Sequence, residues 1–405
     1  MQQQLSTDGE SLLFELKMAD IMANLKTFQP EYEEGTSETL LRLGSRAKGL
    51  AVNGCAHAVF FCKLLKATRQ KEESCKEVPL YSLEPESKSN QSLKIGIIGG
   101  GHIGKQLGRA LLELSGISGY YIQISTRRPE TLLEFQMLGV DCYYNNRQLV
   151  SWADVVFLCC LPSHLPHICL EIQDAIKEHC IIYSLVTAIP LPRLMQLLPS
   201  KAILRPQYTF TDDDPIDIWV TNRTVVEALK NPAVLQVTCP CSCTGGIIVN
   251  MKWLAAVFYA ALNSYSWQRL SYAKTLLLLN QVCFPENFVP ASAEQPFLLA
   301  ENFINQAFAS SLSPDDTFPW FDLTTVQLKK SPFSQLLATS TLLQDNIALF
   351  YYNMMTENLG ESMPDTSGIP LSAVLLKPPK ALSDGIDGSY MGDVEQASST
   401  DSEET

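Results

Sequence analysis

A short glycine-rich run carries the clearest chemical signal in this sequence. Gly99-Gly100-Gly101-His102-Ile103-Gly104 has the spacing G-x-G-x-x-G, and it directly follows the apolar run Leu93–Ile98 and opens a stretch of helical periodicity. In this context Gly99 allows a tight turn, Gly101 lets the backbone approach a pyrophosphate, and Gly104 lets helix and strand pack closely. Helix amides then face the phosphates. The pattern predicts a dinucleotide-binding loop, with a ligand-free structural turn as the alternative.

The residues after the next predicted strand distinguish between the two common dinucleotides. An NAD-binding protein usually has Asp or Glu there, on the ribose 2′-hydroxyl. This chain has Ser125-Thr126-Arg127-Arg128-Pro129, without an acid. Because a guanidinium forms paired hydrogen bonds with a phosphate, this segment predicts a site for the 2′-phosphate of NADP(H). The alternative is that both arginines are solvated loop residues.

Two residues are candidates for acid–base chemistry. His164 comes after the apolar run Asp154–Cys160, at the strand end where open α/β sheets bind ligands, and its imidazole could exchange a proton. The plainer interpretation is a solvated histidine at the start of a helix. Tyr208 follows the last predicted strand of the sheet, and a phenol can donate a proton to a substrate. No sequence feature identifies the proton donor, so the catalytic residue stays unassigned.

A cysteine cluster is a further motif with metal-binding chemistry, beside His164 and His167, which could also suggest a metal. Cys239-Pro240-Cys241-Ser242-Cys243 places three thiols close together, and thiolates bind zinc or copper. No fourth Cys or His lies nearby, so we expect an ordinary strand or loop with buried thiols and no metal site. The twelve cysteines of the chain show no framework spacing, which indicates free thiols in a reducing compartment.

Strand and helix patterns alternate around the glycine loop. Such alternation is typical of βαβ units and a parallel sheet. The continuous apolar run at Asp154–Cys160 indicates a strand that is buried on both faces. The predicted strands are Leu93–Ile98, Tyr120–Ser125, Val140–Tyr144, Asp154–Cys160, Cys180–Leu185 and Lys201–Leu204. We therefore expect an α/β fold with a Rossmann-type parallel-sheet domain.

Helical periodicity dominates the rest of the chain. It occurs before the sheet domain at Ser11–Met22, Glu38–Leu50 and Ala56–Ala67, and after it at Ile247–Phe284, Ala293–Leu312 and Phe333–Leu359, with one strand candidate at Ile216–Val220. The predicted organisation is a helical N-terminal extension (1–75), a linker (76–92), an NADP-binding Rossmann domain (93–206), a mainly helical substrate and dimerisation domain (207–360) and a disordered acidic tail (361–405).

Composition narrows the classes of function. The formal net charge of the 405 residues is −13, and nine acids against two lysines in residues 361–405 supply −7 of it. No basic block is present, so a nucleic-acid surface is not expected. The longest apolar run, near Trp253–Leu262, is too short for a membrane span, and the polar N-terminus does not resemble a signal peptide. We expect a cytoplasmic protein with a small-molecule substrate.

Three segments together resemble a known family. Leu93–Gly104, Ser125–Pro129 and Ala153–Pro162 are similar to the N-terminal domain of pyrroline-5-carboxylate reductases, in a wider group that includes coenzyme F420-dependent NADP oxidoreductases and NADP-dependent oxidoreductase domain-containing proteins. The match covers Leu93–Pro206, little more than a quarter of the chain. The resemblance implies a cofactor site in which Ile98–Ile103 hold the pyrophosphate and the 2′-phosphate is flanked by Ser125, Thr126 and Arg127. Asn146 would lie near the adenosine, and Thr187 near the nicotinamide. The residues beside the cofactor would be Cys160, Leu161 and Pro162.

The resemblance implies an oxidoreductase that transfers hydride from NADPH to a C=N or C=O carbon of a small substrate, with proline biosynthesis as a possible setting. A homodimer through the C-terminal helices follows by analogy. Leu161 replaces a lysine of the family, and its Ser-Gly-Ser-Gly-Pro-Ala and Pro-Gly-Gly-Thr-Thr segments are missing. These departures support the alternative of a catalytically inactive NADP-binding regulatory or interaction protein. A Rossmann scaffold without any ligand is a third interpretation.

Overall fold

Six parallel strands form one sheet in the order β3-β2-β1-β4-β5-β6. The computed structural model describes residues 38–70, 92–211, 217–220, 224–284 and 298–357. The sheet strands are β1 (Ile95–Ile98), β2 (Ile122–Ser125), β3 (Asp141–Tyr143), β4 (Val155–Leu158), β5 (Ile181–Ser184) and β6 (Ile203–Leu204). The strand order reverses direction between β1 and β4, which is where open α/β sheets bind ligands. The predicted Rossmann-type α/β class is confirmed.

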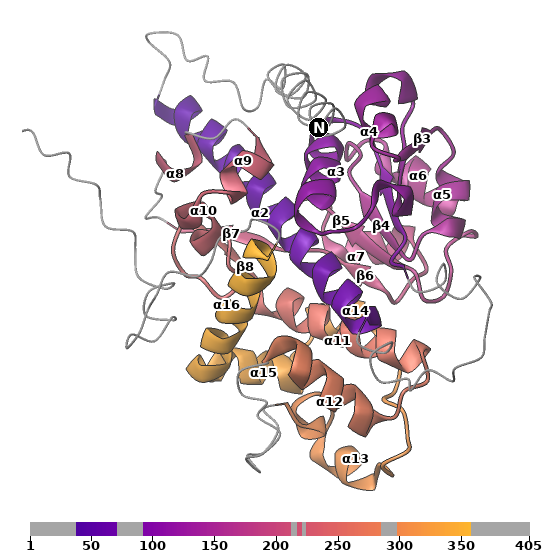
Figure 1. Ribbon diagram of the computed structural model, residues 1–405, viewed down its shortest axis with the longest axis vertical. Coiled ribbons are helices and arrows are strands. Elements are labelled where there is room, and N and C mark those ends of the chain that lie inside the picture. The colour runs from indigo at the N-terminus through magenta and orange to yellow at the C-terminus, as the bar shows by residue number, and fades with distance from the viewer. Residues whose placement is uncertain (1–37, 71–91, 212–216, 221–223, 285–297, 358–405) are drawn as a thin grey trace, which may run out of the picture.

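Helices cover both faces of the sheet (Figure 1). All residues of β1, β4 and β5 are buried, which explains their continuous apolar runs. One face packs against α5, α6 and α7, and the other against α3, α4 and the helical remainder of the chain. The bounds are α3 (His102–Leu114), α4 (Leu133–Met137), α5 (Asn146–Trp152), α6 (Leu165–Ile172) and α7 (Leu191–Leu197), with short 3₁₀ turns η4 (Gly119–Tyr121) and η5 (Pro129–Leu132).

The second half of the described chain is mostly helical, as predicted. Its elements are β7 (Tyr208–Phe210), α8 (Asp217–Val220), α9 (Val225–Leu229), α10 (Pro232–Val237), β8 (Ile247–Val249), α11 (Met251–Trp267), α12 (Tyr272–Cys283), η7 (Ala300–Asn302), α13 (Gln306–Ser311), α14 (Leu323–Leu328), α15 (Pro332–Thr339) and α16 (Thr341–Thr356). Helix α11 is buried around most of its circumference, so it is apolar on nearly all sides and forms the centre of this half.

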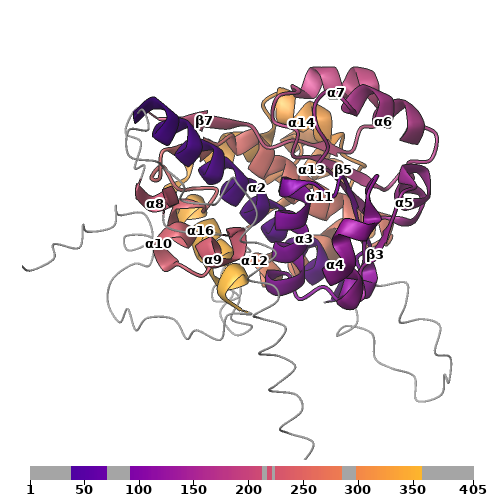
Figure 2. The same ribbon diagram turned by 90° about the horizontal axis from the view of Figure 1, so that it is seen from above.

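The N-terminal helix α2 (Glu38–Gln70) crosses the molecule between its two halves (Figures 1 and 2). It packs against α3 of the sheet domain and against α8, α9, α11 and α16. The two helices predicted at Glu38–Leu50 and Ala56–Ala67 are one continuous helix of 33 residues, so the expected break is wrong. Val52–Cys55 are buried, and this packing outweighs the low helix propensity of Asn53 and Gly54.

Two further predictions are corrected. Of the strand predicted at Ile216–Val220, the described residues 217–220 instead form helix α8, which buries the Trp219 ring beside Gly49 of α2. The Trp219 indole also donates to the carbonyl of Gly245 at 3.2 Å. The helix predicted from Ile247 begins only at Met251, because Ile247–Val249 pair with β7 as an antiparallel strand. In both segments, tertiary contacts determine the secondary structure. Ser11–Met22 and the tail 361–405 lie outside the described residues.

Among the described residues, one helix, at Leu40–Arg69, is long and apolar enough by composition to span a membrane, whereas we expected no such segment. The core helix of a folded protein passes the same test, and 78% of the most apolar window of this helix is buried inside the protein. Its packing thus accounts for its composition.

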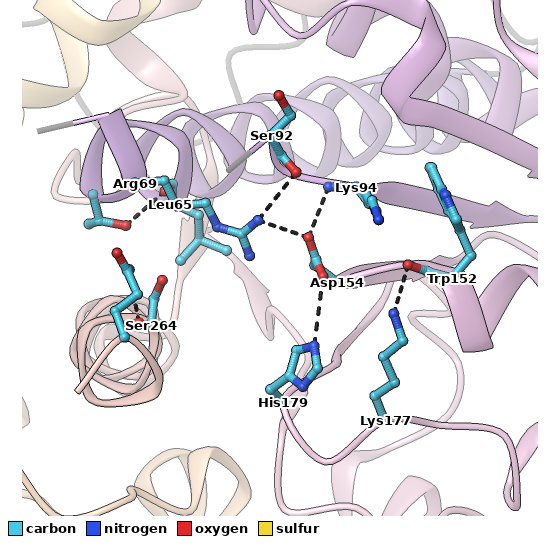
Figure 3. Close-up of polar contacts among 11 residues, drawn as sticks. Leu65, Arg69, Ser92, Lys94, Trp152, Asp154, Lys177, His179 and Ser264 are labelled. Carbon is cyan, nitrogen blue, oxygen red and sulfur yellow. Dashed lines mark hydrogen bonds and ion pairs between the residues drawn. The ribbon is translucent and has the colours of Figure 1, made fainter. Parts of the chain in front are cut away.

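A polar cluster attaches the end of α2 to the amino-terminal edge of the sheet (Figure 3). The Arg69 guanidinium lies 2.8 Å from the carboxylate of Asp154, which directly precedes β4. The same carboxylate accepts the backbone N–H of Lys94 at 3.1 Å, and His179 Nε2 lies 3.8 Å from its other oxygen. The His179 ring stacks on Trp267 at the end of α11. This cluster joins both halves at the edge opposite the glycine loop.

Candidate functional site

The glycine loop has the shape of a phosphate cradle. Gly99 has a φ of +109°, and its N–H donates to the carbonyl of Ser125 at 2.9 Å. A Cβ at Gly99 would lie 2.7 Å from the carbonyl oxygen of Cys159, and a Cβ at Gly104 would collide with the carbonyl of Gly99. At Gly101, by contrast, a Cβ would meet no atom within 4 Å. The loop is therefore closely packed on the protein side and open at Gly101, where a ligand phosphate would approach.

The amino terminus of α3 points its backbone toward this opening. Gly101 is the N-cap residue, no side chain caps the helix, and its first turn contains no acid. The first N–H groups of a helix lack partners within the helix and carry a partial positive charge. The loop and the helix terminus together suit the pyrophosphate of a dinucleotide.

The turn at the end of β2 contains both buried residues, which hold it in place, and exposed residues. Ser125 and Asn146 are both buried; the Ser125 hydroxyl donates to Asn146 Oδ1 at 2.8 Å. Asn146 Nδ2 in turn donates to Glu171 Oε2 at 2.8 Å. Thr126 is half-buried, whereas Arg127 and Arg128 are exposed. Ser125 and Asn146 hold the turn in place, and the two arginines remain accessible to a phosphate.

Glu171 of α6 was missed by sequence reasoning. It lies 25 residues beyond Asn146, and only the packing of α6 against α5 brings the two together. No local pattern in the sequence marks this carboxylate as a partner of the turn.

The segment after β4 lies beside the loop, since Cys159 N–H donates to the carbonyl of Ile98 at 2.9 Å. Cys160 is half-buried, and burial raises the pKa of its thiol to about 11. Leu161 and Pro162 are exposed, with 62% of Leu161 accessible. His164 is the N-cap residue of α6, so the predicted position at the start of a helix is confirmed, but the side chain is half-buried and not fully solvated.

A cavity of about 580 Å³ opens at the carboxyl ends of β5 and β6, and we call it the β5–β6 cavity. Thr187 lines it after β5, and Arg205 lines it after β6. Helix α2 contributes Leu50, α11 contributes Trp253 and α14 contributes Gln327. Except for Thr187 and Tyr208, sequence reasoning did not identify the lining. The position of Arg205 directly after a predicted strand was the one available signal.

Arg205 is firmly positioned at this cavity. Its backbone N–H donates to Gln327 Oε1 at 3.0 Å, and Gln327 Nε2 donates to the carbonyls of Ile203 and Leu323. The guanidinium Nη2 donates to the carbonyl of Thr187 at 2.6 Å. Its Nε is buried and finds no hydrogen-bond partner in the part of the chain that the structure describes. Burial lowers the pKa of this guanidinium, which still stays charged near neutral pH.

Tyr208 lines the same cavity, but its hydroxyl is hydrogen-bonded to a residue outside the lining. His57 of α2 lies 2.9 Å from that hydroxyl through Nδ1 and 2.9 Å from the carbonyl of Thr238 through Nε2. A carbonyl only accepts, so Nε2 carries the proton and Nδ1 accepts from Tyr208. Burial lowers the pKa of His57 to about 4, which keeps the ring neutral. His57 was missed because it lies 151 residues from Tyr208 in the sequence.

The cysteine cluster forms a turn after α10, in which Cys239 and Cys241 are buried and Cys243 is exposed. Among the residues that the structure describes, no three His, Cys, Asp or Glu side chains are grouped so that they could hold a metal ion.

Comparisons with known proteins agree with this geometry. Residues 94–186 match the family described as NADP oxidoreductase, coenzyme F420-dependent. Pyrroline-5-carboxylate reductase 3 of Xenopus laevis is 28% identical over 114 residues, which are 28% of this chain and 42% of that protein. This match supports the resemblance drawn from the glycine loop and its neighbours.

Two solved structures are similar in fold. A pyrroline-5-carboxylate reductase from Coxiella burnetii is 16% identical with a TM-score of 0.28, covering 71% of this chain and 99% of that one. A pyrroline carboxylate reductase from Plasmodium falciparum with NADP bound is 12% identical with a TM-score of 0.25, covering 66% and 97%. Because these TM-scores are low, the fold assignment rests on the strand order and register described above.

A mouse protein provides the family assignment. NADP-dependent oxidoreductase domain-containing protein 1 of Mus musculus is 41% identical over 327 residues, which are 79% of this chain and 89% of the mouse protein. Identity of this extent covers the sheet domain and much of the helical remainder. The chain therefore belongs to the family of NADP-dependent oxidoreductase domain-containing protein 1, and its parallel-sheet domain is the NADP oxidoreductase domain of that family.

Proposed function

We propose that this protein binds NADP(H) across the glycine loop and reduces a C=N or C=O carbon of a small substrate held in the β5–β6 cavity. The observation that carries the proposal is the position of Thr187. By family resemblance this residue flanks the nicotinamide, and in the structure it lines the cavity. A substrate in the cavity would therefore lie next to the reactive end of the cofactor.

The residues present fit the cofactor. The open space at Gly101 and the uncapped terminus of α3 suit the pyrophosphate, and exposed Arg127 and Arg128 suit a 2′-phosphate. When bound, NADPH supplies the hydride. The chain orients the substrate against Thr187 and excludes water with the apolar wall that includes Leu50 and Trp253.

A cationic imine is the substrate type that demands least from this site. The Tyr208 hydroxyl donates to His57, so its proton is not directed at the cavity. An iminium carbon accepts hydride without help from an acid, whereas a carbonyl needs a proton at its oxygen. Pyrroline-5-carboxylate, on which the Xenopus and Coxiella relatives act according to their names, is the first substrate to test, and with it a role in proline biosynthesis.

A catalytically inactive NADP-binding protein is the second candidate. The occupied Tyr208 hydroxyl and the exposed Leu161, in place of the family's lysine, favour it. A cytoplasmic location and a homodimer through the C-terminal helices remain predictions from the sequence.

The test is a thermal-shift titration of the full chain with NADPH, NADP, NADH and NAD, followed by NADPH oxidation with pyrroline-5-carboxylate. A ligand that binds only the native state raises the melting temperature. We expect NADPH to stabilise the wild type and to leave Gly101→Val unshifted, because the added side chain fills the space for the phosphate. Absence of any shift at millimolar nucleotide would overturn cofactor binding. A shift without NADPH oxidation, also with other imines and carbonyls, would favour the inactive binder.

A further inference from the structure

We propose that the β5–β6 cavity selects an amphipathic carboxylic acid, which binds its carboxylate to Arg205 and its apolar body to the wall formed by α2, β7 and α11. The inference rests on the proposed function, since the reacting carbon of this acid would lie beside Thr187. It names a residue and a substrate shape that the family resemblance does not supply.

The charge of the cavity favours an anion. Among the described residues that line it, Arg205 is the one charged side chain, and no Asp or Glu is present. Arg205 also forms no ion pair with an Asp or Glu among the described residues, and its buried Nε has no hydrogen-bond partner among them. A partly buried cation without a counter-ion is costly, and a ligand carboxylate would offset that cost through charge-assisted hydrogen bonds.

The same lining disfavours an ammonium group. A zwitterionic amino acid would bring its cation next to Arg205, with no described carboxylate in the lining to receive it. A 2-oxo acid carries its negative charge without an amino group. The electrostatics thus favour a 2-oxo acid over the corresponding amino acid.

The size of the cavity and its apolar walls favour a ligand with an apolar body. Leu50 of α2, Leu191 of α7, Phe210 of β7 and Trp253 of α11 face the cavity around Arg205. Its volume of about 580 Å³ lies within the range of about 300–1,000 Å³ typical of sites for drug-sized ligands. A short acid such as pyruvate would leave these apolar surfaces wet, whereas an aryl or alkyl chain would cover them.

Helix α2 forms one side of this wall and also contacts the residues of β7 that form another side. Leu50 lines the cavity directly, and the Arg46 guanidinium lies 4.9 Å from the centroid of the Phe210 ring. His57 accepts from the hydroxyl of Tyr208, which is a further residue of the lining. The selection of the apolar body therefore depends on a helix outside the sheet domain.

The probe is 4-phenylbutanoate, compared with its neutral amide 4-phenylbutanamide and with acetate, by isothermal titration calorimetry on the full chain with saturating NADP. On the wild type we expect the acid to bind at least about tenfold more tightly than either comparison ligand. Arg205→Gln should weaken binding of the acid on the order of 10- to 100-fold and leave the amide unchanged. Arg193→Gln, an exposed arginine on α7, is the matched control and should bind like the wild type.

Equal binding of acid and amide by the wild type would overturn the inference, and this comparison needs no variant. Unaltered affinity in a folded Arg205→Gln protein, or acetate binding as tightly as 4-phenylbutanoate, would also overturn it. The NADPH thermal shift on the same preparation separates the two proposals. If NADPH binds and the acid shows no preference, the carboxylate assignment fails and the oxidoreductase proposal stands. If the acid binds through Arg205 and no nucleotide binds, the carboxylate assignment stands and the oxidoreductase proposal fails.

Discussion

Tyr208 donates a hydrogen bond of 2.9 Å to Nδ1 of His57, and this contact joins the start of β7 to the middle of α2. His57 Nε2 donates a hydrogen bond to the carbonyl of Thr238, whose hydroxyl lies 2.9 Å from that of Tyr351 in α16. Four segments that are far apart in the sequence are thus connected behind one wall of the β5–β6 cavity. The arrangement indicates that Tyr208 has a positioning role.

Tyr208→Phe should therefore reduce stability more than turnover. The change leaves the buried Nδ1 of His57 without a donor, which costs about 1–3 kcal/mol in the free energy of unfolding. Urea unfolding measures this loss, and Tyr120→Phe, at a side chain that is 77% exposed, is the control. A variant of unchanged stability whose kcat falls on the order of a hundredfold would instead identify Tyr208 as the proton donor.

The neutral state of His57 makes stability depend on pH. Burial lowers its folded pKa to about 4, below the ordinary value of 6.5, so the unfolded chain binds the additional proton. Stability from this group is complete above pH 6.5 and is lost as the pH falls toward 4, by up to about 3 kcal/mol. We expect His57→Gln to show a flatter stability profile over that window, measured by urea unfolding. His167→Gln, at an exposed histidine, should retain the wild-type slope.

Two glycines of the loop should respond differently to the same substitution. Gly104→Ala places a methyl group against the carbonyl of Gly99 and should lower the melting temperature of the apoprotein. Gly101→Ala meets no atom within 4 Å and should leave that temperature nearly unchanged while weakening NADPH binding. Differential scanning fluorimetry with and without NADPH checks both. Equal destabilisation of the apoprotein by the two changes would contradict the cradle geometry.

Arg127 should determine the preference for NADPH over NADH. Loss of charge-assisted hydrogen bonds to the 2′-phosphate in Arg127→Ala should weaken NADPH on the order of tenfold or more, with NADH unaffected. Fluorescence titration with both nucleotides gives the ratio of Kd values, and Arg193→Ala serves as the control. A parallel loss for both nucleotides would place Arg127 away from the phosphate.

The ion pair between Arg69 and Asp154 should couple α2 to the sheet. Both side chains are mostly buried, with 21% and 15% of them accessible, and the Asp154 carboxylate also accepts from Lys94. Asp154→Asn should therefore cost about 1–3 kcal/mol. A double-mutant cycle with Arg69→Met should give a coupling energy of about 0.5–3 kcal/mol. A coupling near zero would mean that the contact seen in Figure 3 contributes nothing to stability.

The sheet domain could be predicted because its signals are local. The run at Val155–Leu158 is apolar at every position, as a strand buried on both faces requires. Glycine is required at positions 99 and 104 because a Cβ there would collide with backbone atoms a few residues away or in the segment after the adjoining strand. Sequence reasoning therefore identified all six strands and the loop.

The missed features depend on contacts between distant segments. The helical spacing predicts two separate helices at Glu38–Leu50 and Ala56–Ala67, but burial against other helices keeps α2 continuous. Trp219 lies in a helical turn because its ring packs on α2. The β5–β6 cavity takes Leu50 and Gln327 from opposite ends of the described chain. No local pattern encodes such pairs, so only the fold reveals them.

The central position of α2 has a consequence for the order of events during synthesis. This helix leaves the ribosome before every other described element, but α16, which covers part of it, starts 271 residues after Gln70. At a synthesis rate of roughly 5–20 residues per second, the part of the α2 surface that α16 covers stays exposed for on the order of tens of seconds. The nascent chain would be a client for chaperones during this interval, and a ribosome that stalls before Thr341 would release an aggregation-prone intermediate.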